Sequence, residues 1–420
     1  MSVSRREFMG IASAAALAGI AGSACSGETN QSTTDATAQV PTGDDPLGVR
    51  ADFPVASESL YLNTPYIGPS PQPAVDKTIE FLAAKSQDPI LLGAMLEEEE
   101  AVREKFSRLI RAQIGEIGLV SSTSEGENIV VNSLDLKAGD NVVIDDLHYM
   151  TSLVMYSQLA ETLGIETRIV RNVDGVTSPE AFAEMVDDRT KLISVAWISN
   201  RNGYRQDLKA LADLAHAHGA YLYADAVQGV GMIDLDIGPT GVDFLTTGSY
   251  KWLLGGFGVA PFYVRESVMD VVKPDRLGWR MVDERLPDNR YTIYNDARKF
   301  GYATPAFAAI YQLSGSLDYI LNVGTDRIEQ HTVTLAHRLH SGLTEQGFEV
   351  FTPPGNQSAI VSFNHGNDRE IIEKQLEGAG VRLSFRENDA QIRVGPAMFN
   401  NEQDIDAFLD ITKGWREATS

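Results

Sequence analysis

Two kinds of hydrophobic pattern alternate along the chain from residue 51 onward. Short apolar runs rich in β-branched residues are followed by longer stretches, such as 208–218, in which apolar residues recur every three or four positions. The short runs are predicted strands at residues 141–146, 167–171, 192–199, 220–226, 244–247 and 260–264. This alternation predicts βαβ units and a mostly parallel sheet covered by helices on both faces.

The pattern changes after about residue 310. A long helical stretch at 306–346 leads to short predicted strands at 358–364, 382–386 and 391–394. We therefore expect a large domain at 76–310 and a smaller C-terminal α+β domain at 311–420. Residues 51–75 are expected to pack with the small domain.

The first 24 residues are predicted to be a signal peptide. Arg5 and Arg6 lie in Ser-Arg-Arg-Glu-Phe-Met, an Ala/Gly-rich stretch follows at 10–21, and small residues occupy 22–24. This order resembles a twin-arginine signal and implies the twin-arginine export machinery as a partner. The destination would be the periplasm or cell envelope. The alternative is an Ala-rich helix with a chance pair of arginines.

Cys25 is the single cysteine of the chain, so an intramolecular disulfide cannot form. Residues 25–50 are rich in Ser, Thr, Asp and Gly and are predicted to be a disordered polar tether. A cysteine followed by a tether is typical of a lipid-anchored protein, but Gly22 stands where such signals usually have leucine. Lipidation of Cys25 and simple cleavage with a free thiol both remain open.

Composition and charge limit the class of protein. The 420 residues are 43% hydrophobic and 22% charged, which suits a globular enzyme with a large core. The net charge of −23 argues against nucleic acid as a partner, since phosphate binding needs clustered basic residues. No metal ligands are assigned.

Lys251 and Asp225 are the most informative pair in the sequence. Each follows or ends a predicted strand, Lys251 within Thr-Gly-Ser-Tyr-Lys-Trp at 247–252 and Asp225 within 220–226. In a parallel sheet, ligands bind at the C-terminal strand ends. A lysine there can form a Schiff base with pyridoxal phosphate (PLP), and a carboxylate can hold a proton on the pyridine nitrogen. Alone, either residue could be a surface lysine or a helix cap.

A run of hydroxyl residues at 121–124 precedes a predicted helix. Hydroxyls and backbone N–H groups at a helix N-terminus form an anion site, which would suit the cofactor phosphate. The alternative is a plain cap in which Glu127 completes a capping box.

Several spaced motifs resemble the class V aminotransferase family of fold-type I PLP enzymes, over about residue 58 to the end. Residues 121–128 resemble its Gly-Thr-Thr-Glu-Gly-Ile-Asn loop, and Ser-Tyr-Lys at 249–251 is closest to the kynureninase and isopenicillin N epimerase branches. The segment at 297–306, with Arg298 and Gly301, and the arginine before Phe-Asn at 391–400 also match. The resemblance implies an α/β fold with a mostly parallel seven-stranded sheet, and PLP as cofactor.

The resemblance also implies roles for individual residues. Lys251, Asp225 and His148 would be catalytic, with His148 stacked on the pyridine ring; Arg393 would bind the substrate carboxylate. The cofactor phosphate would be held by Thr123, Ser124, Ser249, Tyr250 and, from the other subunit of a homodimer, Thr304; the ring's phenolic oxygen would be held by Asn200 and Gln228. The alternatives are an incidental loop histidine, turn chemistry for Asn200, a surface Gln228 and a surface Arg393.

One departure from the family concerns cysteine desulfurases. These enzymes need a nucleophilic cysteine shortly before the arginine strand, and residues 383–389 contain none. We therefore expect an enzyme that is not a cysteine desulfurase.

The expected function is an exported PLP enzyme acting at the α-carbon of an amino acid or amino-acid-bearing metabolite, with aminotransferase or epimerase-like chemistry. The alternatives are a C–S or C–C lyase of the same family and a periplasmic enzyme that tailors siderophore peptides. A non-catalytic scaffold of the same fold is a further alternative. Fold and cofactor alone do not decide among these reactions.

Overall fold

The computed structural model describes residues 43–89, 91–386 and 390–417. Its centre is a seven-stranded sheet in the order β2-β8-β7-β6-β5-β3-β4. Only β8 runs antiparallel to its neighbours β2 and β7. The strands are β2 (Ile117–Val120), β3 (Asn141–Asp145), β4 (Glu166–Val170), β5 (Thr190–Ala196), β6 (Tyr221–Asp225), β7 (Phe244–Thr246) and β8 (Ala260–Val264). The expected α/β fold is confirmed.

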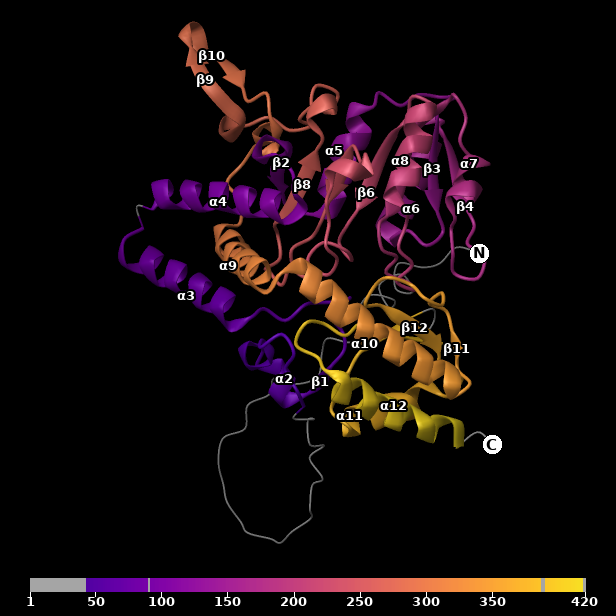
Figure 1. The fold of residues 1–420 in the computed structure, drawn as a ribbon. Helices are drawn as coiled ribbons and strands as arrows, with labels where there is room; N and C mark the ends of the chain where they lie inside the picture. The colour runs from indigo at the N-terminus through magenta and orange to yellow at the C-terminus, as the bar shows by residue number, and fades with distance from the viewer. Residues whose placement is uncertain (1–42, 90, 387–389, 418–420) are drawn as a thin grey trace.

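Helices cover both faces of this sheet (Figure 1), and its strands alternate between two hydrophobic cores. Leu192 and Ile193 are both buried but belong to different cores, as expected for adjacent positions on a strand. The helices of this part are α5 (Thr123–Ser133), α6 (Met150–Leu163), α7 (Pro179–Ala183) and α8 (Leu208–Ala217). On α8, the predicted stripe of Leu208, Leu211, Ala212 and Ala215 is buried.

A smaller domain follows the large one (Figure 1). An antiparallel sheet in the order β11-β12-β15-β14 packs with α10 and α12 around a third core. Its elements are α9 (Phe307–Val323), α10 (Thr325–Glu345), β11 (Glu349–Val350), β12 (Val361–Asn364), α11 (Arg369–Gly378), β13 (Val381–Arg382), β14 (Ser384–Arg386), β15 (Gln391–Val394) and α12 (Glu402–Glu417). The long helical stretch is two helices, because Gly324 adopts a φ of 93° between them.

The N-terminal part of the described chain reaches both domains. Its elements are α2 (Val55–Glu58), β1 (Leu60–Tyr61), α3 (Gln72–Gln87) and α4 (Leu92–Ile110). Strand β1 pairs with β13 of the small domain, while α3 and α4 pack on α9. Within the expected tether, residues 43–50 are described, and Arg50 forms an ion pair of 2.7 Å with the buried Asp404. The expected signal peptide and Cys25 lie outside the described residues.

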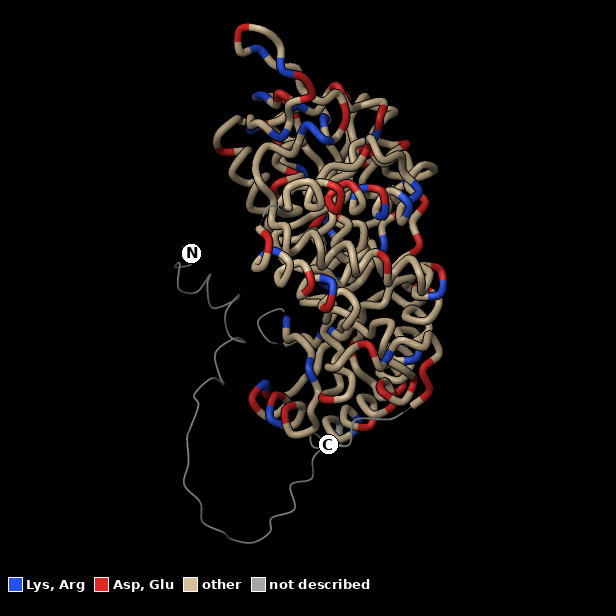
Figure 2. The backbone as a smooth tube through the Cα atoms, turned by 90° about the vertical axis from the view of Figure 1, so that its left-hand side faces the viewer, with Lys and Arg blue, Asp and Glu red and all other residues tan. Residues whose placement is uncertain are grey.

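A hairpin of β9 (Val282–Leu286) and β10 (Arg290–Ile293) projects from the large domain (Figure 1). Short 3-10 helices occupy Arg50–Asp52, Ile114–Glu116, Gly238–Thr240, Glu266–Val268, Trp279–Met281, Pro287–Asn289 and Ala297–Phe300. Figure 2 shows acidic and basic residues interspersed along the outer turns and on the hairpin. Among the described helices, none has the length and apolar character needed to cross a bilayer.

Candidate active site

The residues expected at the site lie together where the parallel strands of the central sheet have their C-terminal ends, which form one edge of the sheet. Asp225 is the last residue of β6, and Lys251 follows β7. His148 follows β3, and Asn200 follows β5. Because these strands are parallel, their C-terminal ends converge, and a ligand-binding crevice at this edge is the expected outcome.

Lys251 is a buried amine at the centre of this edge. Its Nζ lies 5.7 Å from the ring centroids of both Tyr149 and Tyr250. Burial is the main cause that lowers the pKa of Lys251 to about 7; the positive charge of Arg393 lowers it further, while Asp225 opposes the shift. An amine of this kind is unprotonated at pH values where an exposed lysine is charged, so it can act as nucleophile and base.

The turn that holds Lys251 is tightly constrained. Leu254, which is buried, adopts a φ of 58°, a region that non-glycine residues rarely occupy. Its carbonyl accepts hydrogen bonds from the hydroxyls of Ser70 at 2.7 Å and Ser316 at 2.9 Å. A Cβ on Gly68 would lie 1.9 Å from the carbonyl oxygen of Lys251, so only glycine allows this approach. The lysine is therefore positioned by the backbone around it.

Asp225 is a buried carboxylate whose Oδ1 accepts a hydrogen bond from the Val227 N–H at 3.0 Å. Burial raises its pKa, and the hydrogen bond and the charge of Lys251 act in the opposite direction. A carboxylate in this environment suits a partner that carries a proton, such as a pyridinium N–H.

His148 is buried and neutral, because desolvation lowers its pKa to about 3. Its Nδ1 accepts a hydrogen bond from the Tyr149 N–H at 2.7 Å, and its Nε2 lies 3.1 Å from Ser194 Oγ. The ring is thereby fixed in one orientation, as a stacking role requires.

Arg393, on β15, reaches this edge from the small domain. Its side chain is fully buried, and Nη1 donates to the carbonyl of Asn200 at 2.8 Å. Its Nε and Nη2 have no hydrogen-bond partner among the described residues, nor does Asn200 Oδ1. Burial lowers the pKa of Arg393, and Arg386 adds to this effect. A buried guanidinium with free donors requires an anion, so the geometry fits a carboxylate ligand.

The remaining expected residues differ in how free their polar atoms are. The hydroxyls of Thr123 and Ser124, half-buried at the start of α5, donate no hydrogen bond to another described residue and fit a phosphate. By contrast, Ser249 Oγ contacts the carbonyls of Gly256 and Val259, so its one hydrogen would have to turn to reach a phosphate.

The side chain of Gln228, like that of Ser249, is already hydrogen-bonded to other protein groups. Its Nε2 donates to the Pro65 carbonyl at 2.9 Å, and its Oε1 accepts from Trp252 Nε1 at 2.8 Å. One amide hydrogen remains for the cofactor. Thr304 is exposed, and its expected contact with another subunit stays a prediction.

The start of α5 differs from the capping-box alternative. Ser122 caps the helix by accepting from the Glu125 N–H, and the Glu125 carboxylate accepts from the Ser121 N–H at 2.6 Å. Glu127 instead points into the interior, where the sequence alone did not place it. Sequence reasoning also missed Tyr149, whose ring lies beside Lys251 Nζ; its position next to His148 is the only signal in the sequence that could have identified it.

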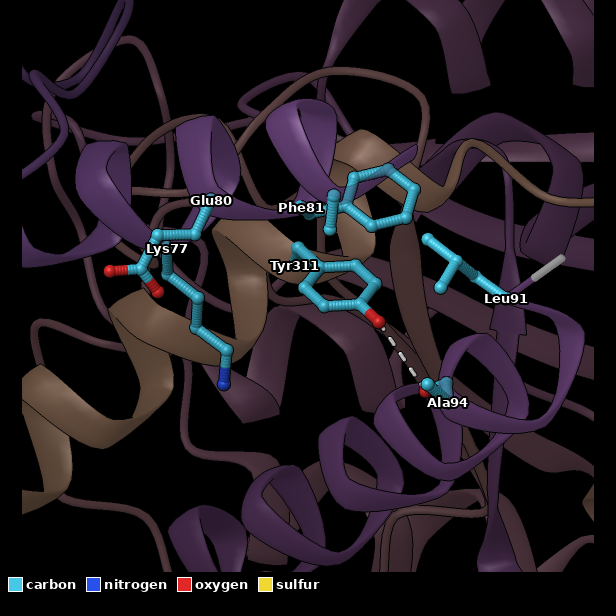
Figure 3. Close-up of a pocket in the computed structure, with 7 residues that line it drawn as sticks. Lys77, Glu80, Phe81, Leu91, Ala94 and Tyr311 are labelled. Carbon is cyan, nitrogen blue, oxygen red and sulfur yellow. Dashed lines mark hydrogen bonds between the residues drawn. The ribbon is translucent and has the colours of Figure 1, made fainter. Parts of the chain in front are cut away.

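A separate cavity of about 260 Å³ lies between α3, α4 and α9 (Figure 3). Phe81 and Tyr311 stack there at 4.1 Å, and the Tyr311 hydroxyl donates to the Ala94 carbonyl at 3.4 Å. None of the expected site residues lines it, so we interpret it as a gap in helix packing.

The comparisons with known proteins agree with this geometry. The model of the class V aminotransferase family matches residues 69–408, and the chain belongs to this family. It is 29% identical to a probable cysteine desulfurase of Methanothermobacter thermautotrophicus, over 85% of this chain and 94% of that protein.

Among solved structures, the apo cysteine desulfurase of Thermococcus onnurineus superimposes with a TM-score of 0.80 at 22% identity, covering 90% of this chain and 99% of that one. The cystine C–S lyase C-DES, solved with its reaction product cysteine persulfide, gives 0.79 at 19% identity, covering 86% and 99%. Another structure of C-DES carries glycine covalently linked to its PLP cofactor. The fold is that of fold-type I PLP enzymes, and PLP is the cofactor of this chain.

The expectation that the chain is not a cysteine desulfurase is contradicted. It rested on one missing cysteine at 383–389, whereas similarity to proteins named cysteine desulfurases extends over most of the chain. The physical error lies in treating an enzyme cysteine as the only route to a persulfide, since the product in the C-DES complex is a persulfide of free cysteine.

Proposed function

We propose that this chain is a PLP-dependent carbon–sulfur lyase that acts on a cysteine-class amino acid. This alternative has better support than the aminotransferase or epimerase-like function, because several relatives, cysteine desulfurases and a cystine C–S lyase, are named for cleavage at sulfur. The observation that carries the proposal is the juxtaposition of Arg393, with free buried donors, and Lys251, whose pKa is lowered to about 7.

PLP, when bound, withdraws electrons from the substrate's α-carbon and so acidifies its C–H bond. Lys251 and Asp225 would hold its aldehyde and its pyridine nitrogen, and Thr123 and Ser124 would bind its phosphate. Arg393 would bind the α-carboxylate in two hydrogen bonds and orient the α-hydrogen. Lys251 Nζ, released from the aldehyde when the substrate's amine takes its place, would then take that hydrogen as a proton.

Loss of the α-proton allows the Cβ–S bond to break, with its electron pair leaving on sulfur. For L-cystine, addition of water balances the reaction: cystine and water give pyruvate, ammonia and cysteine persulfide. For L-cysteine, the corresponding products are pyruvate, ammonia and hydrogen sulfide. Neither reaction needs an external oxidant or reductant.

The test is product analysis with the purified holoenzyme. L-Cystine, L-cysteine, L-alanine and L-glutamate are supplied separately, and pyruvate, persulfide, sulfide and amino-acid products are measured by mass spectrometry. The proposal predicts products of carbon–sulfur cleavage from at least one sulfur amino acid, and none with Lys251→Ala. Racemised or transaminated substrate with intact carbon–sulfur bonds would contradict it.

We also propose that the enzyme is a homodimer. Phe257, Leu277 and Trp279 are exposed by 63%, 81% and 62%, and Phe257 stacks on Tyr250 at 4.8 Å. The exposed Phe257 therefore contacts Tyr250, the residue that precedes Lys251. Burial against a second copy would both cover these apolar side chains and close the site.

A further inference from the structure

Glu127 is a buried carboxylate behind His148 that the proposed reaction does not use. It lies on α5 with 2% of its surface exposed. Ser152 Oγ donates to its Oε2 at 2.7 Å, and Oε1 accepts from Ser194 Oγ at 2.7 Å and from the Tyr156 hydroxyl at 3.0 Å. An ionised carboxylate can only accept hydrogen bonds, so it suits this set of three donors.

Ser194 connects this carboxylate to the histidine. Because His148 Nδ1 accepts from a backbone N–H, the neutral ring carries its proton on Nε2, which faces Ser194 Oγ at 3.1 Å. The single hydrogen of Ser194 points to Glu127, so its oxygen is free to accept from the histidine. The hydrogen bonds thus run in one direction, from His148 through Ser194 to Glu127.

We propose that Glu127 is a positioning residue of the active site, which polarises the His148 imidazole through Ser194 and weakens that polarisation when its carboxylate is protonated. A protonated Glu127 is itself a donor, and Ser194 then loses its charged acceptor. The hydrogen bond from His148 weakens with it, since hydrogen bonds in such a chain polarise one another.

The charge of Glu127 changes in the physiological range. Burial raises its pKa to about 7; hydrogen bonds from Ser152, Ser194 and Tyr156 lower it, and the charge of Asp225 on β6 raises it. Tyr223 on β6 also faces this group, and its own pKa is raised well above the usual value. His148 stays neutral near pH 7, because its pKa is about 3. Asp145, whose pKa burial also raises to about 7, accepts a hydrogen bond from the backbone N–H of His148 and lies outside the chain of side-chain hydrogen bonds. Within the chain from the His148 ring through Ser194, Glu127 is the group whose pKa lies near neutrality.

The chain of hydrogen bonds from His148 through Ser194 to Glu127, called the relay below, is a property of the fold. Its effect on the reaction rests on the proposed function. The experiment uses holoenzyme with ¹⁵N-labelled histidine, and His148→Gln identifies the His148 signal among the seven histidines. The Nε2–H signal is followed by NMR from pH 5.5 to 8.5, together with the cofactor's visible absorbance. We expect the wild-type His148 signal to shift with a midpoint at about pH 7.

Three variants separate the relay from general packing. Glu127→Gln should abolish the shift, because the amide does not titrate, and Ser194→Ala should abolish it while leaving Glu127 in place. The matched control is Ser152→Ala, which removes a hydrogen bond to the same carboxylate outside the path to His148. In Ser152→Ala the His148 signal should still shift with pH, and the midpoint of that shift should rise by roughly one pH unit.

A wild-type midpoint that persists in Glu127→Gln, or in Ser194→Ala, would overturn the relay. If Glu127→Gln does not fold, Ser194→Ala still decides, since it retains two of the three donors to the carboxylate. A titrating His148 signal in a protein that cleaves no carbon–sulfur bond would support the relay and contradict only the proposed function.

Discussion

Arg393 and Asn200, which are far apart in the sequence, meet where Nη1 of the arginine donates to the asparagine carbonyl at 2.8 Å. This bond joins the small domain to the edge of the central sheet. It uses one side of the guanidinium and leaves Nε and Nη2 unpartnered among the described residues. The arginine is thereby held in position with its free donors available to a ligand.

Arg393→Ala should weaken amino-acid binding by roughly 30- to 1000-fold, since a charge-assisted two-point contact in a desolvated site contributes about 2–4 kcal/mol. The measurement is titration of the cofactor's visible band with L-cystine and L-cysteine. Arg338→Ala is the control, because Arg338 forms its ion pair with Asp406 on the surface of the small domain. Equal affinity of Arg393→Ala and wild type would remove Arg393 as the carboxylate anchor and make Arg386 the next candidate.

Cofactor loading should depend on pH in a way that reflects the buried lysine. The pKa of Lys251 is lowered to about 7, so its amine becomes unprotonated as the pH rises through 7 rather than through the usual lysine range. Apoenzyme mixed with PLP should therefore incorporate it faster as the pH rises, with half-maximal rate near pH 7. A rate that keeps rising steeply above pH 9 would contradict the shift.

Asp225→Asn should lower turnover by roughly 10²- to 10³-fold, because an amide cannot hold a charged pyridinium as a carboxylate does. The size of the side chain is preserved, and the Asn side-chain oxygen can still accept from the Val227 N–H. Folding, judged by circular dichroism, should therefore change little. Turnover within threefold of wild type would show that Asp225 is not the partner of the cofactor ring.

The dimer can be tested at its exposed apolar surface. Leu277→Asp should shift the protein toward monomer in light scattering and lower activity, because a charge replaces an apolar contact at the proposed interface. The matched control is Ile371→Asp on α11, where an exposed apolar residue lies in the small domain. Wild-type protein that is monomeric at micromolar concentration would contradict the proposed dimer.

Export stays a prediction from the sequence, because residues 1–42 lie outside the described chain. Changing Arg5 and Arg6 to lysine should leave the protein in the cytoplasm with an uncleaved N-terminus. Incorporation of labelled palmitate that is lost in Cys25→Ala would establish a lipid anchor. Normal export of the double lysine variant would refute the twin-arginine assignment.

Hydrophobic patterning predicted the central sheet well. The six predicted strands from 141 to 264 match β3 to β8 within three residues at each end, since continuous β-branched runs and fully buried parallel strands coincide. The break between α9 and α10 was missed, because the apolar periodicity continues across Gly324 and only its positive φ separates the helices.

The site was predictable as far as it depends on strand ends, and not beyond. Lys251 and Asp225 follow from their positions after β7 and on β6. The inward direction of Glu127 and its link to Ser194 could not be predicted, because helix packing decides which side of α5 faces β5. The engagement of Ser249 and Gln228 with other protein groups likewise depends on tertiary contacts.

Covalent trapping of the cofactor tests the central claim most directly. Holoenzyme is reduced with borohydride, digested with trypsin, and the modified peptide is sequenced by mass spectrometry. We predict a single pyridoxyl adduct on Lys251, absent from Lys251→Ala. An adduct on a different lysine, or full retention of PLP without any reducible bond to Lys251, would contradict the account.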